Sequence, residues 1–472
     1  MLKRLATVLG CVFAAIAVAL AGSGARTVVS VHMANQRLQV VGLPELPGPG
    51  PASRIMVVSP HPDDETLACA GLIQRALSRG ARVSVVVLTS GDAFPASAAA
   101  IFKRIDLSPS DYVRLGEVRR REVTQALSVL GVPEGDIVLL GYPDRGLRDL
   151  WTANWQTPKM ARYTRCTVSP YDPPGSRRAV YRGSSLLEDI EDLILQYSPT
   201  EIYVPHPNDD HEDHRAAGCF VVAAIEELRR DGLLRSPEPE VLTYLVHRGD
   251  WPVPQGLKPN RRLVPPESLW GLDTRWLVLP LTKQEMARKL TAIRTHRSQM
   301  ALPNERRFML SFARANELFG LYRWVLGPHP DEEPPRAVPR QWFGVFDPVC
   351  DKVQRDLQPS ADIDELEVHS DGRRVTFRIE TVGRAAGWVR YRVRVWCMGS
   401  LPDTYALASF DIGPGYRRLN DGVQRRLNGQ VAELSVPIER LTREPHLLMV
   451  AAETRVGGLV VDRTAWRACR LP

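Results

Sequence analysis

The sequence predicts an α/β domain with a Rossmann-like, mostly parallel sheet and helices on both faces, followed by an antiparallel β-sandwich. Between residues 50 and 327, short apolar runs alternate with segments in which apolar residues recur at helical spacing. Beyond residue 341, apolar and polar residues alternate one by one in short runs. The first pattern favours a parallel sheet between two helical layers, and the second favours packed antiparallel sheets. A chain of 472 residues also exceeds what one hydrophobic core usually holds.

The first domain contains apolar runs that predict buried strands. These runs cover residues 55–58, 83–88, 137–140, 202–204 and 241–246. Helical spacing follows or separates them at residues 66–79, 113–130, 186–197 and 216–228. Such alternation predicts βαβ units, in which the carboxyl ends of the strands share one rim and form the ligand crevice.

A Pro-rich segment at residues 328–341 predicts a linker, and residues 342–472 then predict the β-sandwich. Turn signals such as Asp371-Gly372 and Asn428-Gly429 separate its short strands. Because it follows a linker and carries no proposed ligand, we expect the sandwich to be a separate folding unit that does no chemistry. One strand alternates apolar residues with Arg390, Arg392 and Arg394. This arginine face either meets an anionic glycan or lipid headgroup or is simply solvated.

Two polar motifs follow strands of the first domain. HPDDE at residues 61–65 follows the first apolar run, and DDHEDH at residues 209–214 follows the fourth. Each leads into a helix, so both are expected on the same rim. A catalytic zinc takes three ligands from His nitrogen and carboxylate oxygen and leaves a position for water. His61, Asp64 and His214 supply such a set, which would also suit iron(II).

Two ionisable residues remain beside this ligand set. Asp63 precedes a proposed ligand and could take the proton from the attacking water. His211 lies three residues before His214 and could face the substrate oxygen across the metal. A lone HPDD usually marks a turn with a helix-capping Asp. The HPDEE sequence at 329–333 lies in the Pro-rich segment without a preceding strand, and we interpret it as linker.

Together, HPDDE and HEDH resemble the two motifs of the PIG-L/LmbE-like family of zinc-dependent N-deacetylases, which remove acetyl from N-acetylglucosamine-type substrates. The resemblance covers roughly residues 54–300. It implies one zinc per chain held by the same three ligands, with Asp63 as general base. It also implies that His211 stabilises or protonates the tetrahedral intermediate. The residues after this region have no counterpart in the minimal family members.

Three short segments resemble the family more weakly: RRRE at residues 119–122, GYPD at 141–144 and HRSQ at 296–299. In the family, the arginine of the first segment and the aspartate of the second lie at the substrate cleft. The resemblance therefore implies that Arg119 and Asp144 bind substrate. The alternative for Arg119 is a solvated helix face, because it lies in a run of charged residues.

Three further residues near the second motif have weaker assignments. Asp209 and Asp213 are expected to accept hydrogen bonds from the ligand imidazoles and so orient them. Helix capping is the alternative for Asp213. His206 has no role in the family pattern and is expected to be a hydrogen-bonded histidine at the surface or rim.

Residues 151–182 are rich in Pro, Tyr and Arg and lack periodicity, which is typical of a long loop. Its aromatic residues could stack on sugar rings and extend the binding site beyond one ring. These residues are Trp151, Trp155, Tyr163 and Tyr171. The alternative is an insertion that packs on the domain surface.

The N-terminus predicts export. Lys3 and Arg4 precede an uncharged apolar run at residues 5–21 and small residues at 22–25, as in a secretory signal peptide. An uncleaved membrane anchor formed by residues 5–21 is the alternative, so residues 1–25 are a signal peptide or anchor. The expected location is secreted, periplasmic or bound to the cell envelope. The net charge of +7 is mild, and no clustered basic module indicates nucleic-acid binding.

Outside residues 1–25 the chain has six cysteines without a metal-knuckle spacing. Cys69 and Cys219 lie on predicted amphipathic helices and are expected to be small buried apolar groups. Export would permit disulfides, and a bridge between Cys350 and Cys469 is one open option.

The sequence therefore predicts an exported zinc-dependent hydrolase that removes N-acetyl from an N-acetylglucosamine-type sugar in a glycan, glycolipid or glycoside. Two alternatives stay open: a metal amidohydrolase that acts on a non-sugar amide, and a catalytically inactive glycan-binding protein. The presence of Asp63 and His211 disfavours the second, because a binding site alone needs neither.

Overall fold

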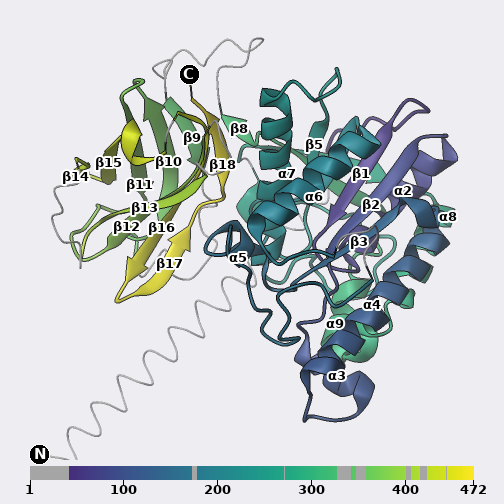
Figure 1. Cartoon of the computed structure of the whole chain (residues 1–472). Helices are drawn as coiled ribbons and strands as arrows, with labels where there is room; N and C mark the ends of the chain where they lie inside the picture. The colour runs from purple at the N-terminus through teal and green to yellow at the C-terminus, as the bar shows by residue number, and fades with distance from the viewer. Residues whose placement is uncertain are drawn as a thin grey trace, which may run out of the picture.

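The first part of the chain is built on a seven-stranded sheet with the order β3-β2-β1-β4-β5-β7-β6 (Figure 1). The computed structural model describes residues 42–172, 178–270, 272–326, 342–346, 358–399, 405–414, 422–442 and 444–471. The five strands that the apolar runs predict pair in parallel. They are β1 (Arg54–Ser59), β2 (Arg82–Thr89), β3 (Ile137–Tyr142), β4 (Glu201–Pro205) and β5 (Glu240–Tyr244). Antiparallel β6 (Thr274–Pro280) and β7 (Asn316–Tyr322) complete the sheet beyond β5.

Helices cover both faces of this sheet because its strands are apolar on both sides. In β1, Ile55 and Val57 face one core cluster, which contains side chains of α2 (Asp64–Ser78), α4 (Pro109–Leu130) and α8 (Lys283–Thr295). Met56 and Val58 face the opposite cluster, which contains side chains of α5 (Leu147–Trp151), α6 (Gly183–Tyr197) and α7 (Glu212–Arg230). Two short helices, α3 (Pro95–Phe102) and α9 (Pro303–Leu310), lie at the periphery. A sheet buried on both faces requires continuous apolar strands, and the predicted fold class is confirmed.

The ends of α4 are fixed by local sequence. Ser108 and Asp111 form a capping box, and Pro109 occupies the first turn, where its missing N–H costs nothing. The helix stops at Gly131, whose φ of 95° is the left-handed conformation that glycine adopts without strain. These signals set the length and position of the helix that carries Arg119.

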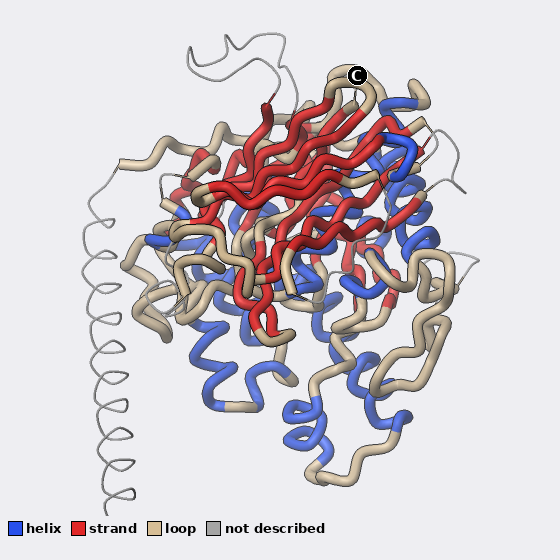
Figure 2. Tube along the Cα trace, turned by 90° about the vertical axis from the view of Figure 1, so that its left-hand side faces the viewer, coloured by secondary structure: helices blue, strands red, loops and turns tan. Residues whose placement is uncertain are grey.

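The C-terminal part forms two antiparallel sheets that pack face to face (Figures 1 and 2). One has the order β14-β15-β11-β10-β9, and the other has the order β13-β12-β16-β18-β8, with β17 paired to β16. Their strands are β8 (Val325–Leu326), β9 (Trp342–Phe346), β10 (Ile363–Ser370), β11 (Arg374–Thr381), β12 (Arg390–Gly399), β13 (Ala406–Ile412), β14 (Gln424–Asn428), β15 (Val431–Pro437), β16 (Pro445–Val456), β17 (Leu459–Arg463) and β18 (Arg467–Arg470). Phe377 of one sheet and Val393 of the other belong to one core between them. This is the sandwich that the period-two pattern predicts.

The outer face of the six-stranded sheet is apolar as well and packs on the α/β part. Because side chains alternate along β12, Val395 faces the sandwich core while Trp396 faces a core cluster shared with α5 and α7. Trp396 lies edge-on to Trp151 and Trp155, with ring centroids 5.8 Å and 4.5 Å away. Its indole N–H donates a hydrogen bond to the carbonyl oxygen of Trp151.

This shared core shows that the sandwich packs on the α/β part, while its folding as a separate unit stays a prediction. Strand β8 follows the last strand of the first sheet directly, yet it pairs in parallel with β18 of the C-terminal sheet. A sequence pattern shows which strand positions are apolar, but not whether an outer face meets solvent or another domain.

Several expectations fall on residues outside those described. They are the N-terminal segment 1–25, the Pro-rich linker 328–341 and Cys350. Among the described residues, no helix has the length and apolar character needed to span a bilayer. Cys69, Cys219 and Cys469 are buried free thiols, which agrees with the apolar role expected of the first two.

Trp396 tests the shared core. Replacing it with Ala empties space between the two parts, so Trp396→Ala should lower the free energy of unfolding by about 3–5 kcal/mol. The measurement is chemical denaturation of the full chain. Trp388→Ala is the matched control, because Trp388 is 52% exposed just before β12. The control should change stability by no more than about 0.5 kcal/mol. Equal effects of both substitutions would contradict the shared core.

Candidate active site

Both polar motifs lie at the carboxyl edge of the sheet, at the point where the strand order reverses. The chain runs from β1 to β2 on one side and from β4 to β5 on the other, so β1 and β4 flank the switch point where α/β sheets bind ligands. His61 lies in the turn after β1, and Asp64 is the first residue of α2. His214 lies in the first turn of α7, which follows β4.

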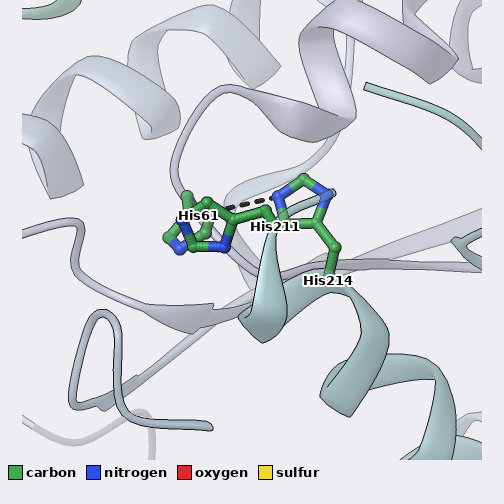
Figure 3. A group of neighbouring side chains, drawn as sticks. All are labelled: His61, His211 and His214. Atoms are coloured by element: carbon green, nitrogen blue, oxygen red, sulfur yellow. Dashed lines mark hydrogen bonds between the residues drawn. The ribbon is translucent and has the colours of Figure 1, made fainter. Parts of the chain in front are cut away.

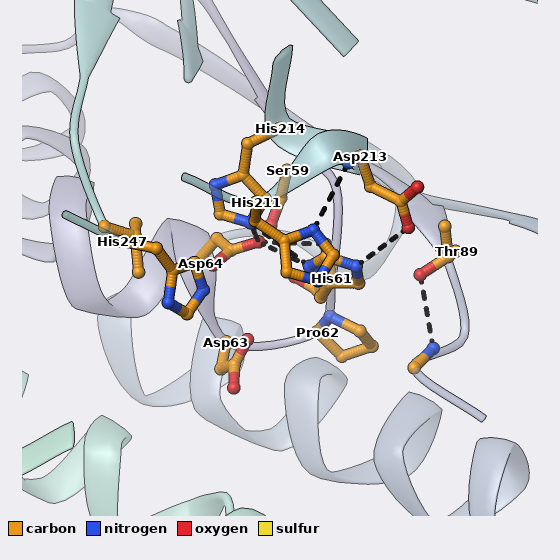
Figure 4. Close-up of polar contacts among 12 residues, drawn as sticks. Ser59, His61, Pro62, Asp63, Asp64, Thr89, His211, Asp213, His214 and His247 are labelled. Atoms are coloured by element: carbon orange, nitrogen blue, oxygen red, sulfur yellow. Dashed lines mark hydrogen bonds and ion pairs between the residues drawn. The ribbon is translucent and has the colours of Figure 1, made fainter. Parts of the chain in front are cut away.

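The three proposed ligands converge on one point. His61 Nδ1 lies 3.2 Å from His214 Nε2 and 3.3 Å from Asp64 Oδ2. The third side of the triangle, from His214 Nε2 to Asp64 Oδ2, measures 3.1 Å. A tetrahedral zinc with bonds of about 2.0–2.1 Å separates its ligand atoms by about 3.3–3.4 Å. The donor set and its spacing therefore fit a zinc ion. Figure 4 draws all three proposed ligands, and Figure 3 draws the two histidine ligands together with His211.

Each ligand imidazole is oriented by a carboxylate on its other nitrogen. His214 Nδ1 lies 3.2 Å from Asp209 Oδ2, and Asp209 is fixed in turn by the backbone N–H groups of residues 211, 246 and 247. His61 Nε2 lies 3.2 Å from Asp213 Oδ2 and 3.2 Å from Asp144 Oδ1. Such carboxylates fix the ring orientation and strengthen a histidine as a metal ligand.

The buried carboxylates make this cluster strongly attractive to positive charge. Burial alone would lower the pKa of His214, but Asp209 and Asp64 raise it to about 10. Burial would raise the pKa of Asp64, but His214 and His61 hold it well below its usual range. The negative charge of these carboxylates would also favour a divalent cation bound to the imidazoles in their neutral form. Metal uptake should therefore release the protons that the imidazoles carry without metal.

Asp63 is held outside the ligand triangle. Gln299 Nε2 donates a hydrogen bond of 2.6 Å to Asp63 Oδ2, and an Arg119 guanidinium nitrogen lies 3.6 Å from the same oxygen. Burial raises the pKa of Asp63 to about 6, although Arg119 acts to lower it. A carboxyl with a pKa close to neutrality can both accept and return a proton.

His211 presents a proton donor to the site. Its Nδ1 accepts a hydrogen bond of 3.3 Å from the backbone N–H of Asp213, which assigns the proton of the neutral ring to Nε2. Burial, and then the neighbouring histidines, lower the pKa of His211 to about 2, so the ring is neutral at pH 7. Its centroid lies 4.6 Å from that of His61. His211 Nε2 can therefore donate to an oxygen that develops negative charge.

The PIG-L family model, described as GlcNAc-PI de-N-acetylase, matches residues 56–225, a range that includes the whole ligand triangle. The chain contains a PIG-L domain. The family consists of metal-dependent N-deacetylases, which gives the enzyme class.

Similar proteins include deacetylases of amino-sugar compounds. The 1D-myo-inositol 2-acetamido-2-deoxy-alpha-D-glucopyranoside deacetylase of Tsukamurella paurometabola is 28% identical over 300 residues, which are 59% of this chain and 95% of the relative. The probable N-acetyl-alpha-D-glucosaminyl L-malate deacetylase 2 of Bacillus anthracis is 25% identical over 177 residues, which are 37% of this chain and 62% of the relative. A solved N,N'-diacetylchitobiose deacetylase from Pyrococcus horikoshii has 19% identity and a TM-score of 0.34, with 55% of this chain and 75% of that chain covered.

The two predicted substrate residues both lie beside the proposed ligands and base, and their binding of substrate stays a prediction. Arg119 is 3% exposed, so the solvated-face alternative is wrong. It donates to the carbonyl oxygen of Gly91 at 2.6 Å and faces Asp63, which makes it a neighbour of the proposed base. Asp144 Oδ1 lies 3.2 Å from His61 Nε2. The other carboxylate oxygen of Asp144 accepts a hydrogen bond of 2.8 Å from the backbone N–H of Ala93. In the described structure its visible role is to orient a ligand.

The aromatic residues of the 151–182 insertion do not form a sugar platform. Trp151, Trp155 and Tyr171 are at most 5% exposed. The two tryptophans pack against the C-terminal sheet, and the Tyr171 hydroxyl donates to Asp92. The expectation of stacking, and with it a preference for longer sugars, loses its basis. The physical reason is that the outer face of the sandwich covers the two tryptophan rings. Tyr171 is buried beside Asp92, and the half-buried Tyr163 packs on Tyr112 with ring centroids 4.8 Å apart.

His206 is not a surface or rim histidine. It is fully buried, its ring stacks on Trp276 with centroids 5.2 Å apart, and its Nε2 lies 2.9 Å from Thr274 Oγ1. Burial lowers its pKa to about 3, so the ring is a neutral part of the core.

Sequence reasoning missed three residues of the site. His247 lies beside His214, with ring centroids 4.9 Å apart, and its ring stacks on Phe308. Gln299 is the partner of Asp63, and Glu65 Oε2 accepts hydrogen bonds from the Ser59 hydroxyl and the Asp63 N–H. Each carried a signal: His247 directly follows an apolar run, Gln299 ends the HRSQ segment, and Glu65 ends HPDDE.

Removal of a ligand should remove the metal. The purified protein should carry about one divalent ion per chain, and His61→Ala or His214→Ala should lose it, because two ligands rarely hold zinc. Elemental analysis after dialysis measures this. His446→Ala is the control, because His446 contacts Glu227 at the domain interface. Wild-type metal content in both ligand variants would refute the site.

The carboxylates that orient the ligand imidazoles should strengthen metal binding although they do not bind the metal themselves. Asp209→Asn keeps the three ligands but weakens the charge on His214, so metal affinity should fall about 10–100-fold. Competition with a chelator measures the affinity. Asp210→Asn is the matched control, because the Asp210 side chain is 47% exposed and pairs with Arg248. Unchanged affinity in Asp209→Asn would remove Asp209 from the site.

Proposed function

We propose that this protein hydrolyses the acetamide of an N-acetylglucosamine-type sugar to acetate and a free amine. The observation that carries the proposal is a triangle of three side chains whose spacing fits a metal ion, with two further ionisable residues beside it, Asp63 and His211, that are not needed as ligands. The names of the similar amino-sugar deacetylases support this substrate class.

His61, Asp64 and His214 would hold the metal. A zinc ion so bound polarises a carbonyl and lowers the pKa of water toward neutrality. Asp63 takes a proton from the attacking water, and Gln299 keeps the accepting carboxylate in place through its 2.6 Å hydrogen bond. As water adds to the acetyl carbon, the carbonyl oxygen becomes negative and His211 Nε2–H donates to it.

The leaving nitrogen must receive a proton before the C–N bond breaks. Protonated Asp63 supplies it, which returns the carboxylate to its starting state and releases acetic acid and the sugar amine. The acid then gives its proton to the amine, so the final products are acetate and the protonated amine. Arg119, 3.6 Å from Asp63, favours the ionised carboxylate and so resets the base. Protons and charge balance over the cycle without a further reactant.

We further propose that the enzyme acts outside the cytoplasm. The support is the charge and apolar pattern of residues 1–25, together with an extra domain that minimal relatives lack. Fractionation of cells that express the full chain, with N-terminal sequencing of the product, tests this. Recovery of the unprocessed chain in the cytoplasm would contradict export, whereas an uncleaved envelope-bound chain would identify an anchor.

Asp63→Asn should retain the metal but lower kcat by at least about 100-fold, because the amide cannot accept the proton. The readout is acetate release together with metal content. Gln299→Ala should have a smaller effect on kcat, since the carboxylate remains. Near-normal turnover in metal-loaded Asp63→Asn would show that another group is the base.

The substrate class is tested by acetate release from a panel of N-acetylated compounds with zinc-loaded and iron(II)-loaded protein. Turnover of N-acetylglucosamine glycosides above that of simple acetamides is expected. Activity only on acetamides without a sugar would favour a different metal amidohydrolase. Tight glycan binding without acetate release by metal-loaded protein would favour an inactive binding protein.

A further inference from the structure

A second polar site lies where the α/β part meets the sandwich. A pocket with about 490 Å³ of atom-free space, solvent-open space included, is lined by residues of α5, α7, β12, β16 and β17 and of the loop before β18. Figure 1 shows where these elements lie. Its polar lining is dominated by arginine, and its apolar lining includes Trp151 and Trp466. The arginines are Arg148, Arg215, Arg394 and Arg463.

The acidic residues of the pocket are already paired. Glu212 lies 2.8 Å from Arg148 NH1 and 2.7 Å from Arg463 NH1. Glu453 lies 2.7 Å from the Nε of Arg455. Its second oxygen is 3.9 Å from Arg463. The two carboxylates therefore form ion pairs with these arginines, and, among the described residues, two further arginines of the pocket have no carboxylate partner.

Arg215 and Arg394 are those two. Within the described part of the chain, neither has a hydrogen-bond or ion-pair partner. Arg394 lies over the Trp466 ring, 5.6 Å from its centroid. Burial lowers the pKa of Arg394, although the nearby Glu453 acts to raise it. An unpaired guanidinium in a partly desolvated pocket is costly unless an anion joins it.

We propose that this pocket binds a small oxyanion, the phosphate or carboxylate group of a ligand, through Arg215 and Arg394. Guanidinium groups match the two oxygens of such a group, and the tryptophan walls reduce the screening of the charges. The site is distinct from the metal centre, because Arg215 and Glu212 leave the first turn of α7 on the side that faces the sandwich while His214 and Asp213 face His61.

The position of the pocket gives it a structural consequence. Arg215 belongs to the PIG-L domain and Arg394 to the sandwich, so a bound oxyanion would link the two parts. It would also lie against the turn of α7 that supplies His214. Anion binding should therefore stabilise the full chain, and this effect does not depend on the proposed reaction.

The test uses metal-loaded full chain and sodium phosphate against sodium chloride of equal ionic strength. Phosphate should bind in calorimetry and raise the melting temperature of the wild type. Arg394→Gln should weaken binding by about tenfold or more, because a charged hydrogen-bond donor is lost. Arg390→Gln is the matched control on the same strand, because Arg390 donates to the carbonyl oxygen of Pro414 and does not line the pocket.

Metal content of each variant is measured in parallel, so a damaged metal centre is distinguished from a lost anion site. Arg215→Gln should repeat the effect of Arg394→Gln from the other side of the pocket. Binding that is equal in wild type, Arg215→Gln and Arg394→Gln would overturn the proposal, as would a wild type that does not bind phosphate. A loss in Arg390→Gln equal to that in Arg394→Gln would show a general charge effect and would also overturn it.

A second experiment, which rests on the proposed function, distinguishes an oxyanion that is part of the substrate from a separate small anion. N-acetylglucosamine 6-phosphate and N-acetylglucosamine are compared as substrates of wild type and Arg394→Gln. A KM increase for the phosphorylated sugar alone would identify the anion as part of the substrate. Unchanged KM values together with lost phosphate binding would identify a separate small anion as the ligand.

Discussion

The structure depends on a concentration of buried negative charge around two imidazoles. Asp64, Asp209 and Asp213 are each 1% exposed, and all lie within 3.3 Å of a nitrogen of His61 or His214. Carboxylates without cations in such surroundings would be unstable by several kcal/mol. Protonated histidines offset this charge only in part, and a divalent cation offsets it more completely. The switch point thus carries a cluster of buried charge that a bound divalent cation would stabilise.

Helix α7 connects this charge cluster with the C-terminal sandwich. Its first turn supplies His214 and is capped by His211, whose Nδ1 accepts from the Asp213 N–H. Farther along, Phe220 packs with the tryptophan cluster shared with the sandwich. At its C-terminal end, Glu226 pairs with Arg470 of β18. A single helix therefore contributes residues to the candidate metal site, the domain interface and the arginine-lined pocket.

The candidate ligands and the candidate base could be proposed from the sequence because a local pattern defines them. A motif that follows a buried strand must lie at the carboxyl rim, and two such motifs on neighbouring strands must meet there. The triangle of His61, Asp64 and His214 is the geometric result. Gln299 and His247 could not be assigned in this way, because each comes from a loop whose path is set by packing. Gln299 follows α8, and His247 is held by stacking on Phe308.

The sequence by itself determined the fold class, the two-part organisation and the residue types of the metal site, since these follow from hydrophobic periodicity and short-range spacing. Only the tertiary structure decided which face of each part is covered. Trp151 and Trp155 are residues of a type that stacks on sugar rings, but they pack against Trp396. Arg119 lies in a run of charged residues typical of a solvated helix face, but its side chain faces Asp63. The physical reason is that burial depends on contacts between residues far apart in the chain, and the periodicity of one strand or helix does not specify its partner.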